Sequence, residues 1–504
     1  MLLAVVVFGI MCGIFGYIGE PKTIHQAIEA LALHAERRGR DSSGFAWLTP
    51  SGSLEVARYD ERVKSSLKKT TRGKTSLVFG HSRLITNGME DNQPIVKTDV
   101  VVIHNGIVVN CDVAWGETPQ QRDLVVDTEI IAALAGDYLR ENRSMEGLSK
   151  LLLDKLIGSM SCVILAPKIG QALLFSNTGS LYVAEGEKNL YFSSERSPLD
   201  KMSAEVRQIM GEETFNFDIA HDIRVSDQSR SRANLIPTLL RSSSEERLLE
   251  YAVPDVRRCT KCILPATMPY IQFDSAGVCN YCENYKIQNS PKPREQLETL
   301  IDTYRKRTGT EAIMPFSGGR DSSFALHLAV KEFGLRTIAY TYDWGMVTDL
   351  GRRNISLMCA ELGVENIVVA ADIEKKRRNI QMNLAAWLKD PQLGMLSILT
   401  AGDKHFYKYV KAIKAEADVE LNLWGVNPLE TTHFKAGFLG VPPKFANTKV
   451  YSSGWSAQVE YHRRRFSYMV RSPGYFNTSL WDTLSGEYYR SISPKDDYHH
   501  LFDY

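Results

Sequence analysis

The sequence predicts two larger α/β domains separated by a short cysteine-rich segment. Up to about residue 235, strand-like runs such as 99–109 and 160–167 are mixed with helical stretches such as Asp127 to Leu139. Four cysteines then gather between residues 258 and 285. From residue 291 onward, short apolar runs alternate with helical patterns, which is typical of a parallel sheet covered by helices.

The composition is that of an ordinary globular chain. It has 504 residues, 24% charged and 44% hydrophobic, so two to four domains are expected. The formal net charge of +1 gives no basic surface for nucleic acid, and no apolar run reaches the length of a membrane span. We therefore expect a cytoplasmic protein with neither a membrane nor a nucleic acid as partner; a homodimer is the assembly that we keep open.

The stretch "MCGIFGYIGE" begins at Met11, after ten mostly apolar residues. No Lys or Arg precedes those ten residues, and no small-residue cleavage pattern follows them, so a secretory signal is not expected. Residues 1–11 are interpreted as a mis-annotated start or a removed leader, which would make Cys12 the first residue. An N-terminal cysteine can use its own α-amine as general base; a buried structural cysteine is the plainer alternative.

Further motifs follow Cys12 in order: "RRGRDSSG" (37–44), "GHSRLITNG" (80–88), "HNG" (104–106) and "DTE" (127–129). Together with "CGIFGYIG" they resemble the class II, or N-terminal nucleophile, glutamine amidotransferase domain. The glucosamine-phosphate synthase and amidophosphoribosyltransferase branches are the most similar. The resemblance implies an α+β Ntn-hydrolase fold, an αββα sandwich, over residues 12–235, with L-glutamine as substrate.

The same resemblance implies a role for each matched residue. Cys12 would attack the glutamine amide, while Asn105 and the backbone N–H of Gly106 would stabilise the oxyanion. Arg83 would hold the α-carboxylate and Asp127 the α-ammonium. Surface charge for the last two and a simple turn at 104–106 are the alternatives. Cys111 and Cys162 lie in strand-like context and are expected in the core.

A linker is expected at 236–255, followed by a zinc-binding segment at 256–290. Its pairs "CTKC" (Cys259, Cys262) and "CNYC" (Cys279, Cys282) are separated by sixteen residues. Four thiolates at this spacing can surround one Zn²⁺, and a site filled by sulfur is structural rather than catalytic. Redox pairs or unrelated buried cysteines are the alternatives.

The segment "MPFSGGRDSS" (314–323) lies between a strand-like run and a helical one, within a domain expected at 291–504. Its glycines allow successive N–H groups to surround a phosphate, but the GK[ST] ending of a Walker loop is missing. It resembles the PP-loop of the N-type ATP pyrophosphatases, which implies an adenine nucleotide α-hydrolase-like sheet, ATP and Mg²⁺. The residues on the motif are Ser317, Gly318, Gly319, Asp321 and Ser322.

Other contacts in this domain are less defined by the sequence. Asp343 ends a strand-like run and would lie near the ribose or adenine, or cap the strand end. Arg352 and Arg353 would face an acidic sugar nucleotide or be exposed helix charge. The candidates near the acceptor are Lys404, His405 and Glu430.

Residues 255–440 resemble the N-acetyl sugar amidotransferase family of surface-polysaccharide (O-antigen) pathways. This implies a sugar or sugar nucleotide as acceptor, and an amidine or amide as product. Two features depart from that family, because the glutaminase is fused here and the final "YHHLFDY" looks like mid-domain sequence, so a truncated C-terminus is expected.

The sequence therefore predicts a glutamine-dependent amidotransferase that cleaves ATP to AMP and pyrophosphate, adenylates an acceptor oxygen and transfers ammonia to it. Asparagine-synthase-like amide formation, modification of a tRNA or nucleobase, and a non-enzymatic assembly subunit are the alternatives.

Overall fold

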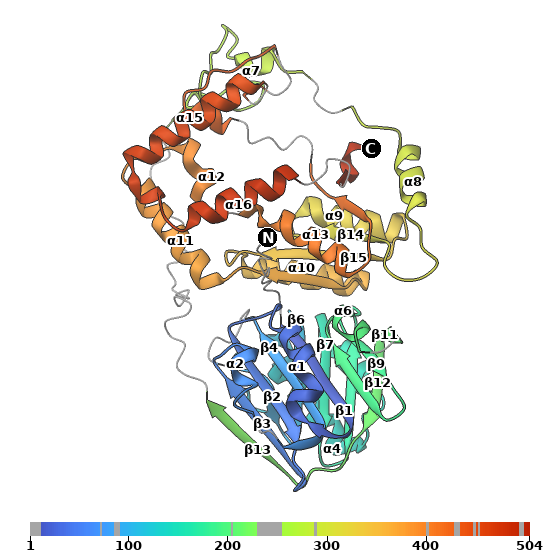
Figure 1. The fold of residues 1–504 in the computed structure, drawn as a ribbon. Helices are drawn as coiled ribbons and strands as arrows, with labels where there is room; N and C mark the ends of the chain where they lie inside the picture. Colours follow the sequence, from blue (N-terminus) through green and yellow to red (C-terminus); the bar gives the residue numbers. More distant parts are fainter. Residues whose placement is uncertain are drawn as a thin grey trace. The chain divides into compact units, whose positions relative to one another are not determined.

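The computed structural model describes residues 12–70, 73–84, 91–202, 205–228, 255–286, 290–399, 403–427, 434–446, 450–451, 454–492 and 498–504. They form two compact units (Figure 1). Unit 1 comprises Met1–Pro237, Thr303–Ile373 and Tyr409–Gly425, and unit 2 comprises the three remaining segments. The expected leader at 1–11 and nearly all of the expected linker at 236–255 lie outside the described residues, so the domain boundaries stay a prediction.

The N-terminal part of unit 1 contains two sheets. The strands of the larger sheet are β1 (Gly13–Thr23), β2 (Ser42–Leu48), β3 (Ser53–Tyr59), β4 (Lys74–Arg83), β9 (Tyr182–Glu185), β10 (Asn189–Ser193), β11 (Val206–Gln208) and β13 (Asp222–Gln228). Their order is β11-β9-β10-β1-β4-β2-β3-β13, antiparallel except for β13 beside β3.

The smaller sheet is antiparallel, with the order β12-β8-β7-β6-β5. Its strands are β5 (Ile95–Lys97), β6 (Val100–Val108), β7 (Gly158–Ala166), β8 (Gln171–Ser176) and β12 (Gly211–Asn216). The helices of this part are α1 (Ile24–Ala35), α2 (Val63–Ser66), α3 (Cys111–Ala114), η1 (Trp115–Glu117), α4 (Thr128–Asn142), α5 (Leu148–Lys155) and α6 (Ser197–Asp200).

Three clusters of buried apolar side chains hold the helices and the two sheets together. Ile14 and Phe79 of the larger sheet share one buried cluster with Val101 of the smaller sheet. Helix α4 covers the outer face of the smaller sheet, and α1 covers the outer face of the larger one (Figure 1). Both faces of β6 are buried at its start, which explains the apolar run at 100–103. The layering is the αββα sandwich that the sequence predicts.

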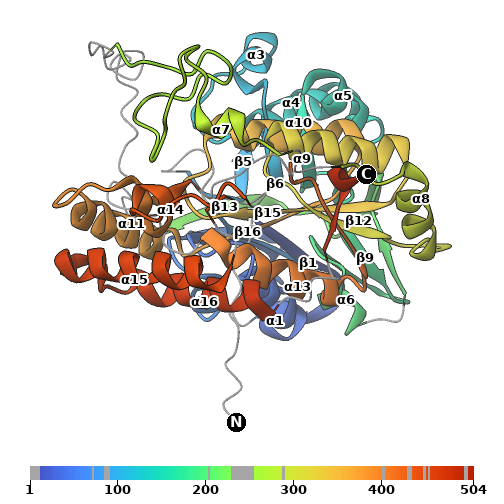
Figure 2. The same cartoon turned by 90° about the horizontal axis from the view of Figure 1, so that it is seen from above.

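The second part of unit 1 is a parallel sheet with the order β16-β15-β14-β17. These strands are β14 (Ala312–Pro315), β15 (Thr337–Asp343), β16 (Asn366–Ala370) and β17 (Leu421–Trp424), each close to a run predicted from the sequence. The helices α9 (Arg320–His327) and α10 (Asp349–Leu362) lie on one face, and α13 (Phe406–Glu416) lies on the other (Figure 2). A short π-helical turn, η2 (Leu328–Glu332), continues α9.

The order of these strands determines where a ligand can bind. Strand β14 is followed in sequence by β15 on one side, but its other neighbour is β17, which comes more than a hundred residues later. The direction of winding therefore reverses beside β14, and crevices at such reversal points are where open α/β sheets bind ligands, at the carboxyl ends of the strands. The loop after β14 is the glycine-rich loop at 316–319.

Unit 2 is mainly helical. Its elements are α7 (Asn280–Glu283), α8 (Arg294–Thr303), α11 (Ile373–Trp387), η3 (Leu393–Met395), α12 (Leu396–Leu399), η4 (Asp403–His405), α14 (Lys435–Phe438), α15 (Trp455–Arg471), η5 (Pro473–Tyr475), α16 (Ser479–Ile492), β18 (His499–His500) and η7 (Leu501–Asp503). Ala386, Met395 and Met469 belong to one buried cluster that joins α11, η3 and α15. Within the residues described, we find no helix that is both long enough and apolar enough to cross a membrane.

A buried carboxyl lies where the sandwich and the parallel sheet meet inside unit 1. The hydroxyl of Tyr182 donates to Glu365 Oε2 at 2.5 Å, and Glu365 is only 6% exposed. Burial raises the pKa of Glu365 to about 7, against the opposing effects of the Tyr182 hydrogen bond and of Arg38. The folded unit therefore resists ionisation of this group.

Glu365→Gln should stabilise the protein at pH 8 more than at pH 5. The folded pKa lies above the ordinary value of 4.5, so the stability that neutral Glu365 contributes is complete below about pH 4.5 and is lost as the pH rises through about 7. The gain at pH 8 is at most about 3 kcal/mol. Thermal unfolding at both pH values measures it, with the exposed Glu187→Gln as control. Equal shifts at both pH values would contradict the assignment.

Candidate functional site

Cys12 lies directly before β1, in the interior of the sandwich. Its Sγ is 3.5 Å from the carbonyl oxygen of Leu84, and the residue is 9% exposed. Gly13 pairs with Ser82, which brings Cys12 to the end of β4 where Arg83 lies. Burial raises the pKa of the Cys12 thiol, while the charge of Arg83 lowers it in part. The thiol is therefore protonated near neutral pH and needs a base to become a nucleophile.

Arg83 and Asp127 place opposite charges around this thiol. Both are almost fully buried, at 2% and 5% exposure. Asp127 accepts from the backbone N–H of Val108 at 2.8 Å, and its Oδ1 lies 3.9 Å from His104 Nδ1. Both charges act on the pKa of Cys12, which shows that the structure brings the three predicted residues together. Buried charges so placed suit a substrate with both an ammonium and a carboxylate group.

Asn105 and Gly106 lie on β6, opposite Ser161 and Met160 of β7. Gly106 has a φ of +149°, and a Cβ there would lie 1.9 Å from the carbonyl oxygen of Ser159, so only glycine fits. Asn105 is 4% exposed, and its Oδ1 has no hydrogen-bond partner among the described residues. The buried amide keeps hydrogen-bonding capacity for a ligand.

Asn105 and Gly106 also line a small pocket inside unit 1. Its other walls come from β7, the segment 178–180, helix α10 and the start of β16. The lining residues are Asn105, Gly106, Ile107, Ser159, Thr178, Ser180, Arg352, Ile355, Ser356 and Asn366. The pocket thus connects the sandwich with the parallel sheet.

The glycine-rich loop leads from β14 into α9. Ser322 Oγ donates to the carbonyl oxygen of Gly319 at 3.0 Å and lies 3.1 Å from Ser317 Oγ, so the two serines fasten the loop to the first turn of the helix. Gly318 has a φ of +73°, and a Cβ there would lie 2.8 Å from the carbonyl oxygen of Gly351. No side chain caps α9, so its first N–H groups face the loop, as an anion site requires.

Asp321 lies in the first turn of α9, with its side chain 32% exposed and 3.4 Å from Arg320 Nε. A hard divalent cation prefers oxygen ligands, so this carboxylate fits Mg²⁺ that is shared with phosphate oxygens and water.

Helix α10 packs against the glycine-rich loop. Thr348 caps its N-terminus by accepting from the N–H of Gly351, and Gly363 ends it in the left-handed conformation. Arg352 donates from Nε and Nη2 to Asp343 Oδ2 at 3.1 and 2.8 Å, and Asn354 donates to the carbonyl oxygen of Gly318 at 3.4 Å. The sequence left the role of Arg352 open. It did not indicate Asn354, because a polar residue on a predicted helix gives no sign of a contact with a distant loop.

The contacts of Asp343 favour the strand-end alternative. The residue ends β15 and is 3% exposed. Besides Arg352, it accepts from the backbone N–H of Gly345 at 2.8 Å. The carboxylate therefore fixes the β15–α10 connection beside the loop, and a contact of Asp343 with ATP stays a prediction.

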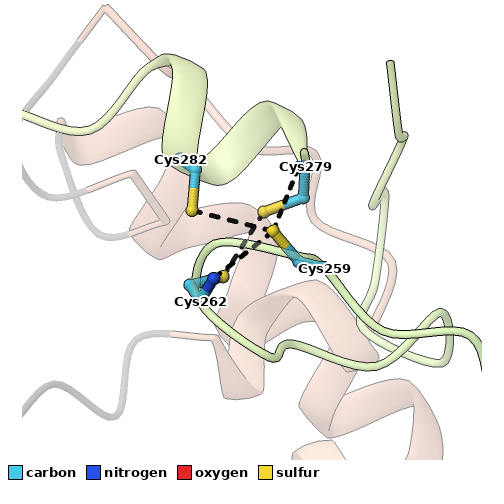
Figure 3. Close-up of side chains that lie close together, drawn as sticks. All are labelled: Cys259, Cys262, Cys279 and Cys282. Carbon is cyan, nitrogen blue, oxygen red and sulfur yellow. Dashed lines mark hydrogen bonds between the residues drawn. The ribbon is translucent and has the colours of Figure 1, made fainter. Parts of the chain in front are cut away.

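The four cysteines of unit 2 converge on one point (Figure 3). The Sγ–Sγ distances are 3.9 Å for Cys259 and Cys282 and 3.6 Å for Cys262 and Cys279. Tetrahedral zinc with Zn–S bonds of about 2.3 Å would separate its sulfurs by about 3.8 Å, which these distances match.

The backbone around Cys259 favours a thiolate. The N–H groups of Lys261, Cys262 and Cys279 donate to its Sγ at 3.4, 3.5 and 3.2 Å. Burial acts to raise the pKa of Cys259, but these N–H groups outweigh it, and the pKa falls to about 6. The donor set and its spacing fit a structural zinc site.

Two of the three acceptor candidates contact α16. His405 Nε2 lies 2.6 Å from Ser485 Oγ, and Lys404 forms an ion pair with Glu487. Burial lowers the pKa of His405 to about 4, so its ring is neutral. Glu430 lies outside the described residues. The contacts that the structure describes for Lys404 and His405 are with α16, and a substrate role of the three candidates stays a prediction.

Two of the three remaining cysteines, Cys162 and Cys111, were expected in the core, and they differ from each other. Cys162 lies in β7 and is fully buried, as expected. Cys111 begins helix α3 and is half-buried, so its placement in a strand was wrong.

Comparison with known proteins supports the domain that the sequence predicts in the first half of the chain. Residues 81–201 match the model of the glutamine amidotransferase domain. A glutamine–fructose-6-phosphate aminotransferase (isomerizing) from Buchnera aphidicola is 27% identical over 201 residues, covering 38% of this chain and 32% of that protein. The enzyme of the same name from Xylella fastidiosa strain 9a5c is 36% identical over 167 residues, 31% of this chain and 25% of that protein.

The chain thus carries a class II glutamine amidotransferase domain and is an enzyme. The match spans only about a quarter to a third of the length of those curated relatives.

Solved structures show weaker likeness. The glutamine phosphoribosylpyrophosphate amidotransferase from B. subtilis, complexed with ADP and GMP, aligns with a TM-score of 0.33 and 16% identity over 66% of each chain. The NMN synthetase from Francisella tularensis aligns with a TM-score of 0.20 and 14% identity, over 41% of this chain and 99% of that one.

We expect purified protein to contain about one zinc per chain, because the sulfur geometry suits one tetrahedral ion. Cys282→Ser should lower the zinc content measured by elemental mass spectrometry. Cys111→Ser changes a cysteine outside the cluster and should leave the zinc content unchanged. Folded protein without zinc after chelator-free purification would contradict the prediction.

Proposed function

We propose that the chain is a glutamine-dependent, ATP-driven amidotransferase that adenylates an acceptor oxygen and then replaces AMP by ammonia. The observation that carries the glutaminase half is the buried Cys12 near Arg83 and Asp127, the last two within the matched residues 81–201. The observation that carries the synthetase half is the glycine-rich loop at the point where the parallel sheet reverses its winding.

In the glutaminase half, the raised thiol pKa of Cys12 requires a base, and a free α-amine at the same residue would supply it. The thiol proton passes to that amine while sulfur attacks the amide carbon of glutamine. The carbon–nitrogen bond breaks, the leaving nitrogen takes the proton as ammonia, and water then hydrolyses the thioester to glutamate. Asn105 and the N–H of Gly106 stabilise the oxyanion, and Arg83 and Asp127 hold the substrate's charged groups.

In the synthetase half, the N–H groups of the loop and of α9 hold the phosphates of ATP. The acceptor oxygen attacks the α-phosphate, the bond to the β-phosphate breaks, and pyrophosphate leaves. Mg²⁺ at Asp321 would neutralise charge on the departing phosphates. Ser317 and Ser322 keep the loop in shape for this cleavage.

Ammonia is mostly protonated in water near pH 7, so a useful donor must reach the adenylated acceptor unprotonated. The pocket beside Asn105 and Gly106 supports an internal passage, because some of its other walls belong to α10 and to β16 of the parallel sheet. We propose that ammonia leaves the glutaminase on this side.

For the acceptor, we propose an N-acetylated or uronic sugar or its nucleotide. The support is the resemblance of residues 255–440, which include the cysteine segment and the glycine-rich loop. The cytoplasmic location expected from the sequence stays a prediction.

Cys12→Ala should abolish release of glutamate from L-glutamine, because no other group can form the thioester. Ammonium chloride should still support AMP formation with a panel of N-acetylated and uronic sugar nucleotides. Cys162→Ala removes a buried thiol outside the site and serves as the control. Glutamine-dependent turnover in Cys12→Ala would refute the assignment.

The nucleotide products should be AMP and pyrophosphate, formed only with an acceptor present. The loop lacks the lysine with which a Walker loop reaches the β- and γ-phosphates. Asp321→Asn should lower AMP formation by about 10-fold or more, since one carboxylate ligand of the metal is lost, and should leave basal glutamate release largely intact. Chromatography of the products tests both statements, and ADP with phosphate would disprove the mechanism.

A further inference from the structure

The hydroxyl of Ser356 is inserted into the hydrogen-bond ladder between β6 and β7. The backbone N–H of Ser159 donates to Ser356 Oγ at 2.8 Å, and Ser356 donates in turn to the carbonyl oxygen of Ile107 at 2.7 Å. In an antiparallel ladder, hydrogen-bonded pairs alternate, and Val109 donates to Ile157 two residues farther along. Ile107 and Ser159 are partners in this register, and the hydroxyl bridges the N–H of Ser159 and the carbonyl oxygen of Ile107.

This bridge lies one residue from the proposed oxyanion site. Gly106 precedes Ile107 and approaches the carbonyl of Ser159 so closely that a Cβ would be 1.9 Å away. The His104 ring also reaches that carbonyl, at 3.2 Å. The direction of the Gly106 N–H therefore depends on where Ser159 is held, and Ser356 is one of the groups that hold it.

Ser356 belongs to α10, whose preceding turn contacts the glycine-rich loop. Asn354 donates to the carbonyl oxygen of Gly318, and Gly318 packs directly on the backbone of Gly351. Arg352, one turn before Ser356, holds Asp343 at the end of β15. A phosphate that orders the loop therefore acts on the same helix that completes the β6–β7 ladder.

We propose that Ser356 is a positioning residue for the glutaminase, through which a nucleotide bound at 317–322 sets the backbone beside Gly106. This inference rests on the proposed function. Occupancy of the loop favours one position of α10, and that position aligns the oxyanion N–H.

The test uses the full chain and α,β-methylene-ATP, which cannot be cleaved between the α- and β-phosphates. In the wild type, the analogue should raise the kcat for glutamate release with little change in KM for glutamine. Ser356→Ala should lower kcat about 10-fold and lose this response, since the bridge is missing. Ser159→Ala removes a neighbouring hydroxyl, 3.0 Å from Ser356 Oγ, but keeps the backbone N–H, and should retain the response.

Hydrogen exchange gives a second measurement that needs no activity. The amides of residues 158–160 should exchange faster in Ser356→Ala than in Ser159→Ala, and the analogue should slow exchange only where Ser356 is present. Equal exchange in the two variants, or a nucleotide response that survives in Ser356→Ala, would overturn the proposal. If the wild type releases no glutamate, the proposed function fails, and hydrogen exchange alone decides the role of Ser356.

Discussion

The placement of helix α10 against two different backbones is the constraint on which the chemistry of this chain depends. On one side the helix supplies the Ser356 hydroxyl to the ladder beside Gly106, and on the other it packs on Gly318 of the glycine-rich loop. Hydroxyl–backbone bonds and a glycine contact tolerate little displacement, because a shift of an ångström breaks the bonds or opens the contact. A single well-capped helix therefore contacts both places at which the two proposed reactions would occur.

Charged side chains are buried beside the glycine-rich loop and also near Cys12. Asp343 and Arg352 neutralise each other beside the loop, where an isolated charge would be costly to bury. Near Cys12, Arg83 and Asp127 are also buried, and Asp127 accepts from the backbone N–H of Val108. In the proposed function these two charges hold the carboxylate and ammonium groups of glutamine, whereas Asp343 and Arg352 hold the connection between β15 and α10.

Much of the architecture was predictable because local pattern decides it. The apolar runs that became β14, β15, β16 and β17 are short, continuous and separated by helices, and the four cysteines met as their spacing predicts. Contacts between residues that are far apart in the sequence were not predictable. Ser356 meets Ser159 across 197 residues, and a serine on an amphipathic helix looks like any solvent-facing residue. Cys111 was misplaced because the strand pattern of β6 continues in the sequence past the point where the chain turns into α3.

The late position of β17 has a consequence for how the protein is made. Ala312 and Ile313 of β14 pair with Leu421 and Asn422, so the edge of β14 stays open until the ribosome has added more than a hundred further residues. Domains generally fold as units, N-terminal first, during synthesis. The sandwich around Cys12 can thus close while the parallel sheet still lacks β17. A nascent chain would complete the sandwich well before this sheet, and the exposed edge of β14 would need protection in the interval.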